Sequence, residues 1–276
     1  RIYGTANIIG MDVNVVYAGK GYWALVLGGS SGLGWATVKQ LASQGMNIAM
    51  VHRDRKSYIN SWGAEWEELE SMWPVQTVRW NRNALLEGKR KGILDELEER
   101  IGSDDQVRVF VHALSRGNLK LMTGERVLSE SDISHTAHAM GTSYYEWAAD
   151  VRGRGMFQRG SRCIGFTSAG NQRVWPHYAA VSVAKNVLES LSRSMAVEWG
   201  PEGIRSNLIQ AGITDTPSLR AIPGYNELLQ GSAEKNPLGR TTRAEDVAQV
   251  VDLLCRPESD WVNGAVIPVD GGETLL

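Results

Sequence analysis

Short apolar segments alternate with longer segments of helical periodicity along most of this chain, and no other feature limits the possible folds as strongly. The first pair is the apolar run YWALVLGG (22–29) and the helical run LGWATVKQLASQG (33–45), which Gly45 closes. Further apolar runs follow at 47–53, 75–81, 106–114, 161–170, 204–212 and 263–272, with helical runs at 59–73, 91–102, 129–153, 177–200 and 243–255. Such apolar runs are typical of buried parallel strands, which need helical crossovers. We therefore predict an α/β fold with a doubly wound, seven-stranded parallel sheet and helices on both faces, in a single domain.

The size and charge of the chain exclude several classes of protein. Its 276 residues suffice for one large α/β domain, and no low-complexity linker divides them. We assign residues 21–276 to that domain and residues 1–20 to a peripheral N-terminal arm. A formal net charge of −2 gives no electrostatic basis for binding nucleic acid or a membrane surface. No apolar run approaches the roughly 18 residues of a membrane-spanning helix.

The two cysteines give no sign of a disulfide or a metal site. Cys163 and Cys255 are far apart in the sequence and lack metal-ligand spacing. Together with an N-terminus that lacks the apolar core of a signal peptide, they favour a reducing, cytoplasmic location.

A glycine-rich turn joins the first predicted strand to the first predicted helix. It places Gly28, Gly32 and Gly34 in a G-x-x-x-G-x-G spacing. Glycine permits positive φ values and close backbone approach to a phosphate, and a helix N-terminus offers free N–H groups to an anion. The spacing differs from the G-x-G-x-x-G of the standard dinucleotide fingerprint, and a plain tight turn is the alternative. At the first strand of an alternating pattern, the turn indicates a dinucleotide phosphate site.

From Tyr22 to Gly272 the sequence resembles the short-chain dehydrogenase/reductase family. The resemblance rests on the glycine spacing and on the segments AKNVLESLSRSMAVEWGPEGIRSNLIQAG (184–212), NPLGRTTRAEDVAQVVDLLC (236–255) and VNGAVIPVDGG (262–272). It implies a Rossmann-type fold, a nicotinamide cofactor and, usually, a homotetramer. One departure is Leu27, which stands where threonine is usual.

The resemblance also implies which residues contact the cofactor. They are Gly28, Ser30, Ser31, Gly32, Leu33, Gly34, His52, Arg53, Asn81, Arg82, His112, Ala113, Leu114, Lys185, Gly212, Ile213, Thr214 and Thr216. Backbone at Ile213 and Thr214 would pair with the carboxamide, and Thr216 would reach a phosphate. Asn81 replaces an aspartate that usually lies against the adenine, and its amide can both donate and accept there.

The segment VHRDR (51–55) bears on the choice between NADPH and NADH. By the resemblance His52 is the tip of the second strand and Arg53 follows it, and a cation there favours the 2′-phosphate of NADPH. Ser30 would add a hydrogen bond to that phosphate. Asp54 lies twenty residues beyond Gly34, a spacing that favours NADH, and a solvated loop charge is the alternative role of Arg53. We weigh the strand end over the spacing and expect NADPH.

The segment PHYAAVSVAK (176–185) contains a tyrosine and a lysine seven residues apart. The family usually has Tyr-x-x-x-Lys, and Lys185 aligns with its lysine without a gap, so that Val181 stands at the usual tyrosine position. Seven helical residues turn through about 700°, which returns Tyr178 and Lys185 to one face about two turns apart. Within the family, this Tyr-x6-Lys spacing resembles that of the enoyl-acyl-carrier-protein reductases.

A tyrosine displaced from the lysine suits alkene reduction. A ketone accepts hydride at the carbon that bears the oxygen, whereas an enoyl thioester accepts it at C3 and develops charge on the distant thioester oxygen. Tyr178 would stabilise that enolate as a hydrogen-bond donor, and Lys185 would bind the ribose hydroxyls of the cofactor. Ser168 matches the family's catalytic serine. The alternatives are packing at a helix start for Tyr178 and capping of a strand end for Ser168.

Two departures from the family pattern lie near the predicted site. Met140 stands where the family has an asparagine that holds the water of a proton relay, which weakens a ketoreductase interpretation. His112 opens the segment HALS (112–115), where Asn-Asn-Ala-Gly is usual. An enoyl reductase pattern has histidine there, but we expect His112 to be a packed, hydrogen-bonded residue rather than a catalyst.

Two surface features are interpreted more broadly. Residues from about 215 to about 240 mix apolar and polar side chains around proline and glycine, as a mobile substrate lid would. A cluster of arginines precedes the fifth strand and is either a contact for an acidic carrier protein or a solvated basic loop: Arg152, Arg154, Arg159 and Arg162.

These observations lead to one hypothesis and two rivals. We expect an NADPH-dependent enoyl reductase that acts on a 2-enoyl thioester carried by an acyl carrier protein, in fatty-acid or related acyl-chain biosynthesis. The first rival is a reductase of the same fold that acts on a ketone, such as a 3-ketoacyl thioester, or on a dienoyl thioester. The second rival, motivated by Leu27, Asn81 and Met140, is a non-catalytic NADP-binding regulator.

Overall fold

A parallel sheet of seven strands runs through the molecule in the order β5-β4-β3-β6-β7-β8-β9. The computed structural model describes residues 5–8 and 11–276. The strands of this sheet span Tyr22–Leu27 (β3), Asn47–His52 (β4), Thr77–Asn81 (β5), Gln106–His112 (β6), Arg162–Thr167 (β7), Arg205–Ala211 (β8) and Val266–Val269 (β9). All neighbouring pairs are parallel. The predicted doubly wound sheet is confirmed, and each strand lies within one of the seven predicted apolar runs.

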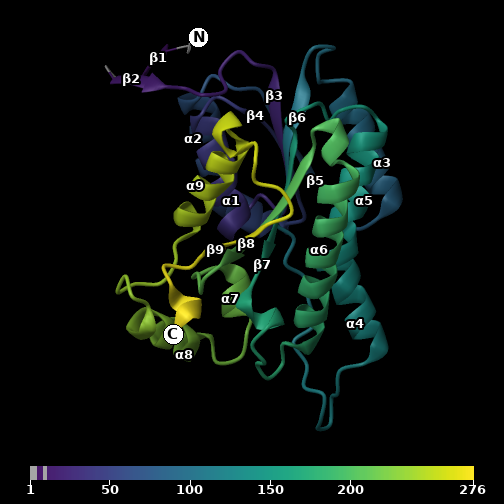
Figure 1. Ribbon diagram of the computed structural model, residues 1–276, viewed down its shortest axis with the longest axis vertical. Coiled ribbons are helices and arrows are strands. Elements are labelled where there is room, and N and C mark those ends of the chain that lie inside the picture. The colour runs from purple at the N-terminus through teal and green to yellow at the C-terminus, as the bar shows by residue number, and fades with distance from the viewer. Residues whose placement is uncertain (1–4, 9–10) are drawn as a thin grey trace.

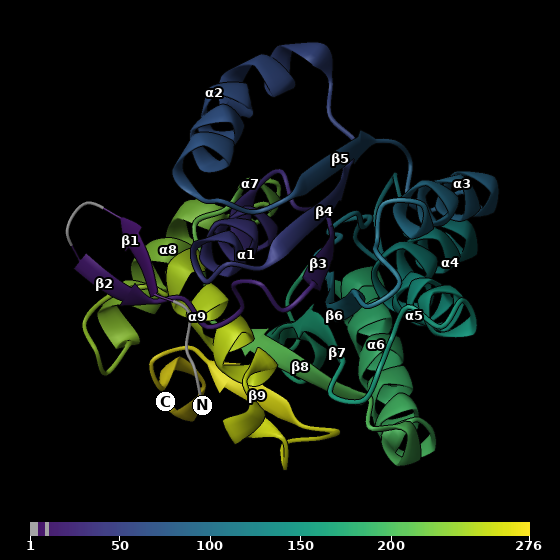
Figure 2. The ribbon, with the colours of Figure 1, turned by 90° about the horizontal axis from the view of Figure 1, so that it is seen from above.

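Helices cover both faces of the sheet (Figure 1, Figure 2). One layer contains α1 (Gly32–Ser43), α2 (Lys56–Met72) and α9 (Ala244–Cys255), and the other contains α3 (Glu87–Glu98), α5 (Ser143–Gly153) and α6 (Ala179–Glu198). Along β3, Trp23, Leu25 and Leu27 pack toward the α3–α5–α6 layer, and Ala24 and Val26 pack toward the other. Because both faces are buried, the strand is a continuous apolar run instead of an alternating one.

The single helix predicted at 129–153 is interrupted. α4 spans Glu130–Ala137, a π-helical turn covers His138–Thr142, and α5 follows. α4 begins with a capping box, in which the Ser129 hydroxyl accepts from the Asp132 N–H and the Asp132 carboxylate accepts from the Ser129 N–H. π-helical turns are frequent at functional sites, and this one carries Met140.

The order of the strands creates a place for a ligand. The chain builds the sheet outward from β3 in one direction and from β6 in the other, so these two neighbours form a topological switch point. The start of α6, the short helix α7 (Pro217–Arg220) and α8 (Tyr225–Lys235) gather at the lower end of the molecule in Figure 1. The segment predicted as a lid contains α7 and α8.

The predicted N-terminal arm contains a pair of antiparallel strands, β1 (Thr5–Ile8) and β2 (Met11–Asn14), separate from the main sheet. Residues 1–4 and 9–10 of the arm lie outside the described residues. The arm meets the domain at the buried Tyr17, whose hydroxyl donates to Asp252 Oδ1 of α9 at 2.7 Å.

Two findings concern features that the sequence analysis considered. Cys163 of β7 and Cys255 of α9 are free, buried thiols. Among the described residues, no helix combines the length and the apolar character needed to cross a membrane.

Candidate active site

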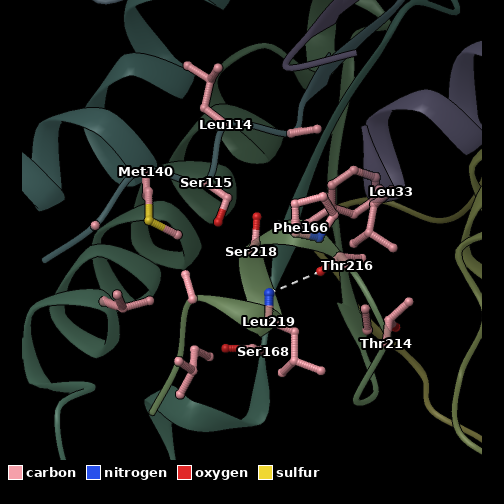
Figure 3. A pocket seen from close by; sticks show the side chains of 18 of the residues that line it. Leu33, Leu114, Ser115, Met140, Phe166, Ser168, Thr214, Thr216, Ser218 and Leu219 are labelled. Atoms are coloured by element: carbon pink, nitrogen blue, oxygen red, sulfur yellow. Dashed lines mark hydrogen bonds between the residues drawn. The ribbon is translucent and has the colours of Figure 1, made fainter. Parts of the chain in front are cut away.

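Two adjoining cavities lie along the carboxyl ends of the parallel strands. The first, of about 240 Å³, is bounded by the first turn of α1, the ends of β6, β7 and β8, and α7 (Figure 3). The second, of about 310 Å³, lies at the ends of β3 and β4. Both are lined by Ser31, Ala113, Leu114, Ser115 and Ser218, so that they form one cleft across the switch point. Open α/β sheets bind nucleotides at this location.

The glycine turn forms the phosphate-binding part of the cleft. Gly28 has a φ of +74° and Gly32 a φ of +51°, which L side chains rarely adopt. A Cβ on Gly34 would lie 2.2 Å from the carbonyl oxygen of Gly28, so only glycine permits this approach of helix to strand. α1 begins at Gly32 without a side-chain cap from Ser31, and the residues of its first turn line the cleft. The turn therefore fits a pyrophosphate, held by backbone N–H groups and the helix dipole.

A polar network follows β4 beside the second cavity. His52 Nδ1 lies 2.7 Å from Asp54 Oδ2, and burial lowers the pKa of His52 although Asp54 opposes the shift. The Asn81 amide binds the Asp54 backbone twice, accepting from its N–H at 2.9 Å and donating to its carbonyl at 3.0 Å. The Asp54 carboxylate thus has a partner. Arg53 is exposed, lines the cavity and forms no ion pair within the described part of the chain.

Tyr178 is the N-cap residue of α6, and its neighbours fix its ring. His177 before it has a φ of +67°, a left-handed conformation that other residues must maintain. The ring packs on Gly170, where a Cβ would lie 2.4 Å from Tyr178 Cε1. The hydroxyl lies 3.0 Å from Ser168 Oγ. Burial raises the pKa of Tyr178 and the bond with Ser168 opposes the rise, so the phenol is protonated at neutral pH and is available as a donor.

Lys185 contacts the same strand end as Tyr178. Its side chain is buried, and Nζ donates to the carbonyl of Phe166 at 2.6 Å. Burial lowers the pKa of Lys185 to about 8, and the charge of Glu189 opposes this shift. The ammonium is therefore present at neutral pH and is lost as the pH rises above about 8. The tyrosine and the lysine are linked through the end of β7, where they bind Ser168 and Phe166 respectively.

The helical side of the cleft is apolar where the family has its water relay. Met140 reaches the cavity from the π-helical turn, across from Thr214 and Thr216 in Figure 3. A thioether is at most a weak hydrogen-bond acceptor. His112 is buried and also lines this cavity, with Nε2 2.8 Å from Ser143 Oγ, and burial, followed by the charge of Lys185, lowers its pKa to about 3. His112 is therefore a neutral, packed residue at the wall of the site, as its sequence context predicts.

The segment after β8 closes the cleft and already has internal partners. Gly212, Ile213 and Thr214 line the first cavity. The Ile213 N–H, which we expected to pair with the cofactor carboxamide, donates to Glu273 Oε2 at 3.0 Å. Thr216 caps α7, and its hydroxyl accepts from the Leu219 N–H at 3.2 Å (Figure 3).

The arginine cluster before β7 is not a free basic surface. Arg152, Arg154 and Arg162 form ion pairs with acidic residues of neighbouring elements, and Arg159 donates to the carbonyl of Pro201. Arg162 is 1% exposed. The cluster lies at the amino ends of the strands, opposite the cleft. Arg154 and Arg162 connect parts of the chain to one another, whereas Arg152 and Arg159 are exposed, and the two interpretations of the cluster stay predictions.

Apart from Asn81, every predicted catalytic and cofactor-contacting residue lines one of the two cavities. Asn81 instead shapes the loop that contains Asp54. Four residues that hold parts of the site by hydrogen bonds were not identified from the sequence: Thr167, Asn171, Glu189 and Glu273. Only Glu189 left a signal, because an acidic residue four positions after Lys185 shares its helix face. The others reach the site through tertiary contacts.

Known proteins share this fold and these sequence features. Residues 28–274 match the model of a family described as enoyl-(acyl carrier protein) reductase. A tropinone reductase homolog of Arabidopsis thaliana is 26% identical and is aligned over 96% of this chain and 97% of its own. The enoyl-acyl-carrier-protein reductase (NADH) FabI of Bacillus subtilis is 30% identical over 64% of this chain and 67% of its own. The crystal structure of FabI from Candidatus Liberibacter asiaticus has the same fold, with a TM-score of 0.80, 23% identity and coverage of 95% of this chain and 97% of that one.

Proposed function

The chain belongs to the enoyl-(acyl carrier protein) reductase family of the short-chain dehydrogenases/reductases and is an NAD(P)H-dependent oxidoreductase; within this family, we propose that it reduces the 2,3 double bond of a 2-enoyl thioester with NADPH. One observation carries the proposal. Tyr178, a protonated donor bonded to Ser168, occupies the start of α6 two turns before Lys185, and the apolar Val181 lines the cavity at the usual tyrosine position.

The proposed reaction gives each residue a separate task. A bound nicotinamide would supply the hydride, which adds to C3 of the alkene. Lys185 would bind the ribose hydroxyls as an ammonium and hold the nicotinamide at the end of β7. Tyr178 would donate to the thioester oxygen, where the negative charge develops, and Ser168 would orient the phenol. The carbonyl re-forms when C2 takes up a proton, which leaves the saturated thioester.

Ketone reduction is the second candidate, and a specific observation favours it. The tropinone reductase homolog aligns over nearly the whole chain, whereas the Bacillus enoyl reductase aligns over about two thirds. Against it stand Met140, which cannot hold a relay water, and Val181, which removes the phenol from the position next to the lysine. A ketone needs a proton donor at the oxygen bonded to the carbon that receives hydride, and Val181 stands where the family has that tyrosine.

NADPH is favoured by the charges at the second cavity. Asp54 Oδ2 is bonded to His52, which leaves Oδ1 able to accept from another group, so the preference is argued from Arg53 and not from Asp54. Arg53, which forms no ion pair with any residue that the structure describes, would offer its guanidinium to a 2′-phosphate, and Ser30 lines the same cavity. The Bacillus relative is named for NADH. The proposed preference therefore rests on these residues of this chain.

The residues that would bind the acyl chain of the substrate are proposed from the lining of the first cavity. Leu219 and Ile222, from α7 and the loop that follows it, line the first cavity and would cover an acyl chain, as a lid does. The family description makes an acyl carrier protein the proposed carrier, in acyl-chain biosynthesis. A homotetramer remains the expected assembly.

A paired substrate assay tests the proposed function. Crotonyl and 3-ketobutyryl thioesters are each offered with NADPH and with NADH, and cofactor oxidation is followed by absorbance. We expect oxidation of NADPH with the crotonyl thioester. Oxidation with the ketone alone would replace the proposal by its rival.

A further inference from the structure

We propose that Glu189 is a positioning residue for the reacting half of the site, where it fixes the serine turn under Tyr178 and sets the electrostatic environment of Lys185. The roles of Tyr178 and Lys185 on which this inference rests are those of the proposed function. Glu189 lies in the segment 184–212 that carries the family resemblance, but it is not among the predicted catalytic or cofactor-contacting residues.

The carboxylate of Glu189 is buried and binds both ends of one short turn. Oε1 accepts from Thr167 Oγ1 at 2.8 Å and from Asn171 Nδ2 at 2.5 Å. Thr167 is the last residue of β7, and Asn171 ends the 3₁₀ turn that follows Ser168. One oxygen atom thus holds the residues on either side of Ser168 and Gly170.

That turn positions the Tyr178 hydroxyl. Ser168 Oγ lies 3.0 Å from the hydroxyl, and Gly170 is in contact with the ring. A turn freed from Glu189 would move both contacts together. Among the described residues, the buried Asn171 Oδ1 has no hydrogen-bond partner, so the bond to Glu189 is the one that holds this side-chain amide.

The same carboxylate lies one helical turn from Lys185. Its charge favours the protonated lysine against the effect of burial. Three other ionisable groups surround the pair. His112 is neutral because burial and the lysine lower its pKa to about 3, and Tyr178 is neutral because burial raises its pKa. Arg193 Nη1 lies 3.9 Å from Glu189 Oε2. Lys185 is thus the group that titrates near pH 8.

Glu189→Gln removes the charge and keeps an oxygen for Thr167 and Asn171. The experiment measures the Kd of NADPH by fluorescence from about pH 6 to about pH 9, a range that brackets the lysine pKa of about 8. In the wild type, binding should weaken as the pH rises through that value. In E189Q the weakening should begin about one pH unit lower, which makes binding about threefold weaker at intermediate pH and close to tenfold weaker at the upper end of the range. Glu198→Gln, an exposed position on the same helix, should match the wild type.

Asn171→Ala tests the second part of the role, because it opens the turn and leaves the charge. It should lower kcat for whichever thioester the wild type reduces and leave the pH profile of NADPH binding unchanged. This variant also carries the test if E189Q does not fold. The assignment is overturned if the pH profile of NADPH binding is unshifted in E189Q, or if E189Q loses the same affinity at every pH. It is also overturned if N171A keeps the kcat of the wild type. The binding profile needs no substrate, so a wild type that fails to reduce the enoyl thioester contradicts the proposed function alone.

Discussion

The nucleotide half of the cleft is made of backbone, whereas the reacting half is made of side chains that hold one another. At the glycine turn, positive φ values and a 2.2 Å clearance at Gly34 decide which residues fit. At the end of β7, hydrogen bonds from Lys185 and Tyr178 decide where the reacting groups lie. Substitutions in the nucleotide half should therefore impair binding because a new side chain clashes with the backbone. Substitutions in the reacting half should impair the reaction because a charge or a hydrogen-bond donor is lost.

The largest effect, a fall in kcat, is expected when the Tyr178 hydroxyl is removed from the reacting half. Tyr178→Phe removes the hydroxyl and keeps the ring on Gly170, so kcat should fall by roughly 10²–10³-fold while the Kd of NADPH is unchanged. Steady-state kinetics beside a cofactor titration measures both. Tyr145→Phe, at an exposed position of α5, is the matched control. Near-normal turnover in Y178F would remove the phenol from the mechanism.

The next effect belongs to the backbone half. Gly34→Ala forces a Cβ against the Gly28 carbonyl, which should lower the free energy of unfolding by about 1–3 kcal/mol and weaken NADPH binding. Gly63→Ala adds a Cβ within α2, where no atom lies within 4 Å, and should raise stability by about 0.4–1 kcal/mol. Thermal unfolding and cofactor titration separate the two. Equal behaviour of the two variants would contradict the steric account.

A smaller effect is expected where a side chain contributes to the nucleotide half. Arg53→Gln removes the proposed partner of the 2′-phosphate and should weaken NADPH binding about tenfold, with NADH unchanged. Arg55→Gln is the control, since Arg55 is exposed nearby but does not line the cavity. Isothermal titration with both cofactors gives the ratio. If R53Q weakens NADH binding as much, Arg53 does not select the cofactor.

The smallest effect, a change in NADPH binding, is expected at Glu273, where the two halves of the cleft meet. Glu273→Ala frees the Ile213 N–H, which we propose pairs with the carboxamide, and should tighten NADPH binding by a few-fold, the value of about one hydrogen bond. Leu275→Ala, an exposed position in the same C-terminal turn, is the control. Weaker binding in E273A would mean that Glu273 supports the cofactor instead of competing with it.

The same contrast explains what could be predicted from the sequence. The strands are continuous apolar runs because both sheet faces are buried, and the glycine turn has local causes, so both were visible in the sequence. The orientation of Asn81, the π-helical turn at Met140 and the Thr167–Glu189–Asn171 bonds depend on residues distant in the sequence. The ion pairs of the arginines before β7 could not be predicted for the same reason, because their acidic partners lie on other elements.

The central claim is that the displaced Tyr178 makes this a site for alkene reduction. NADPH carrying deuterium at the transferable C4 position, incubated with the enzyme and crotonyl thioester, tests it most directly by mass spectrometry of the product. The account predicts butyryl thioester with one deuterium at C3. Absence of label in that product, together with a deuterated 3-hydroxybutyryl thioester when the 3-ketobutyryl substrate is supplied, would contradict it.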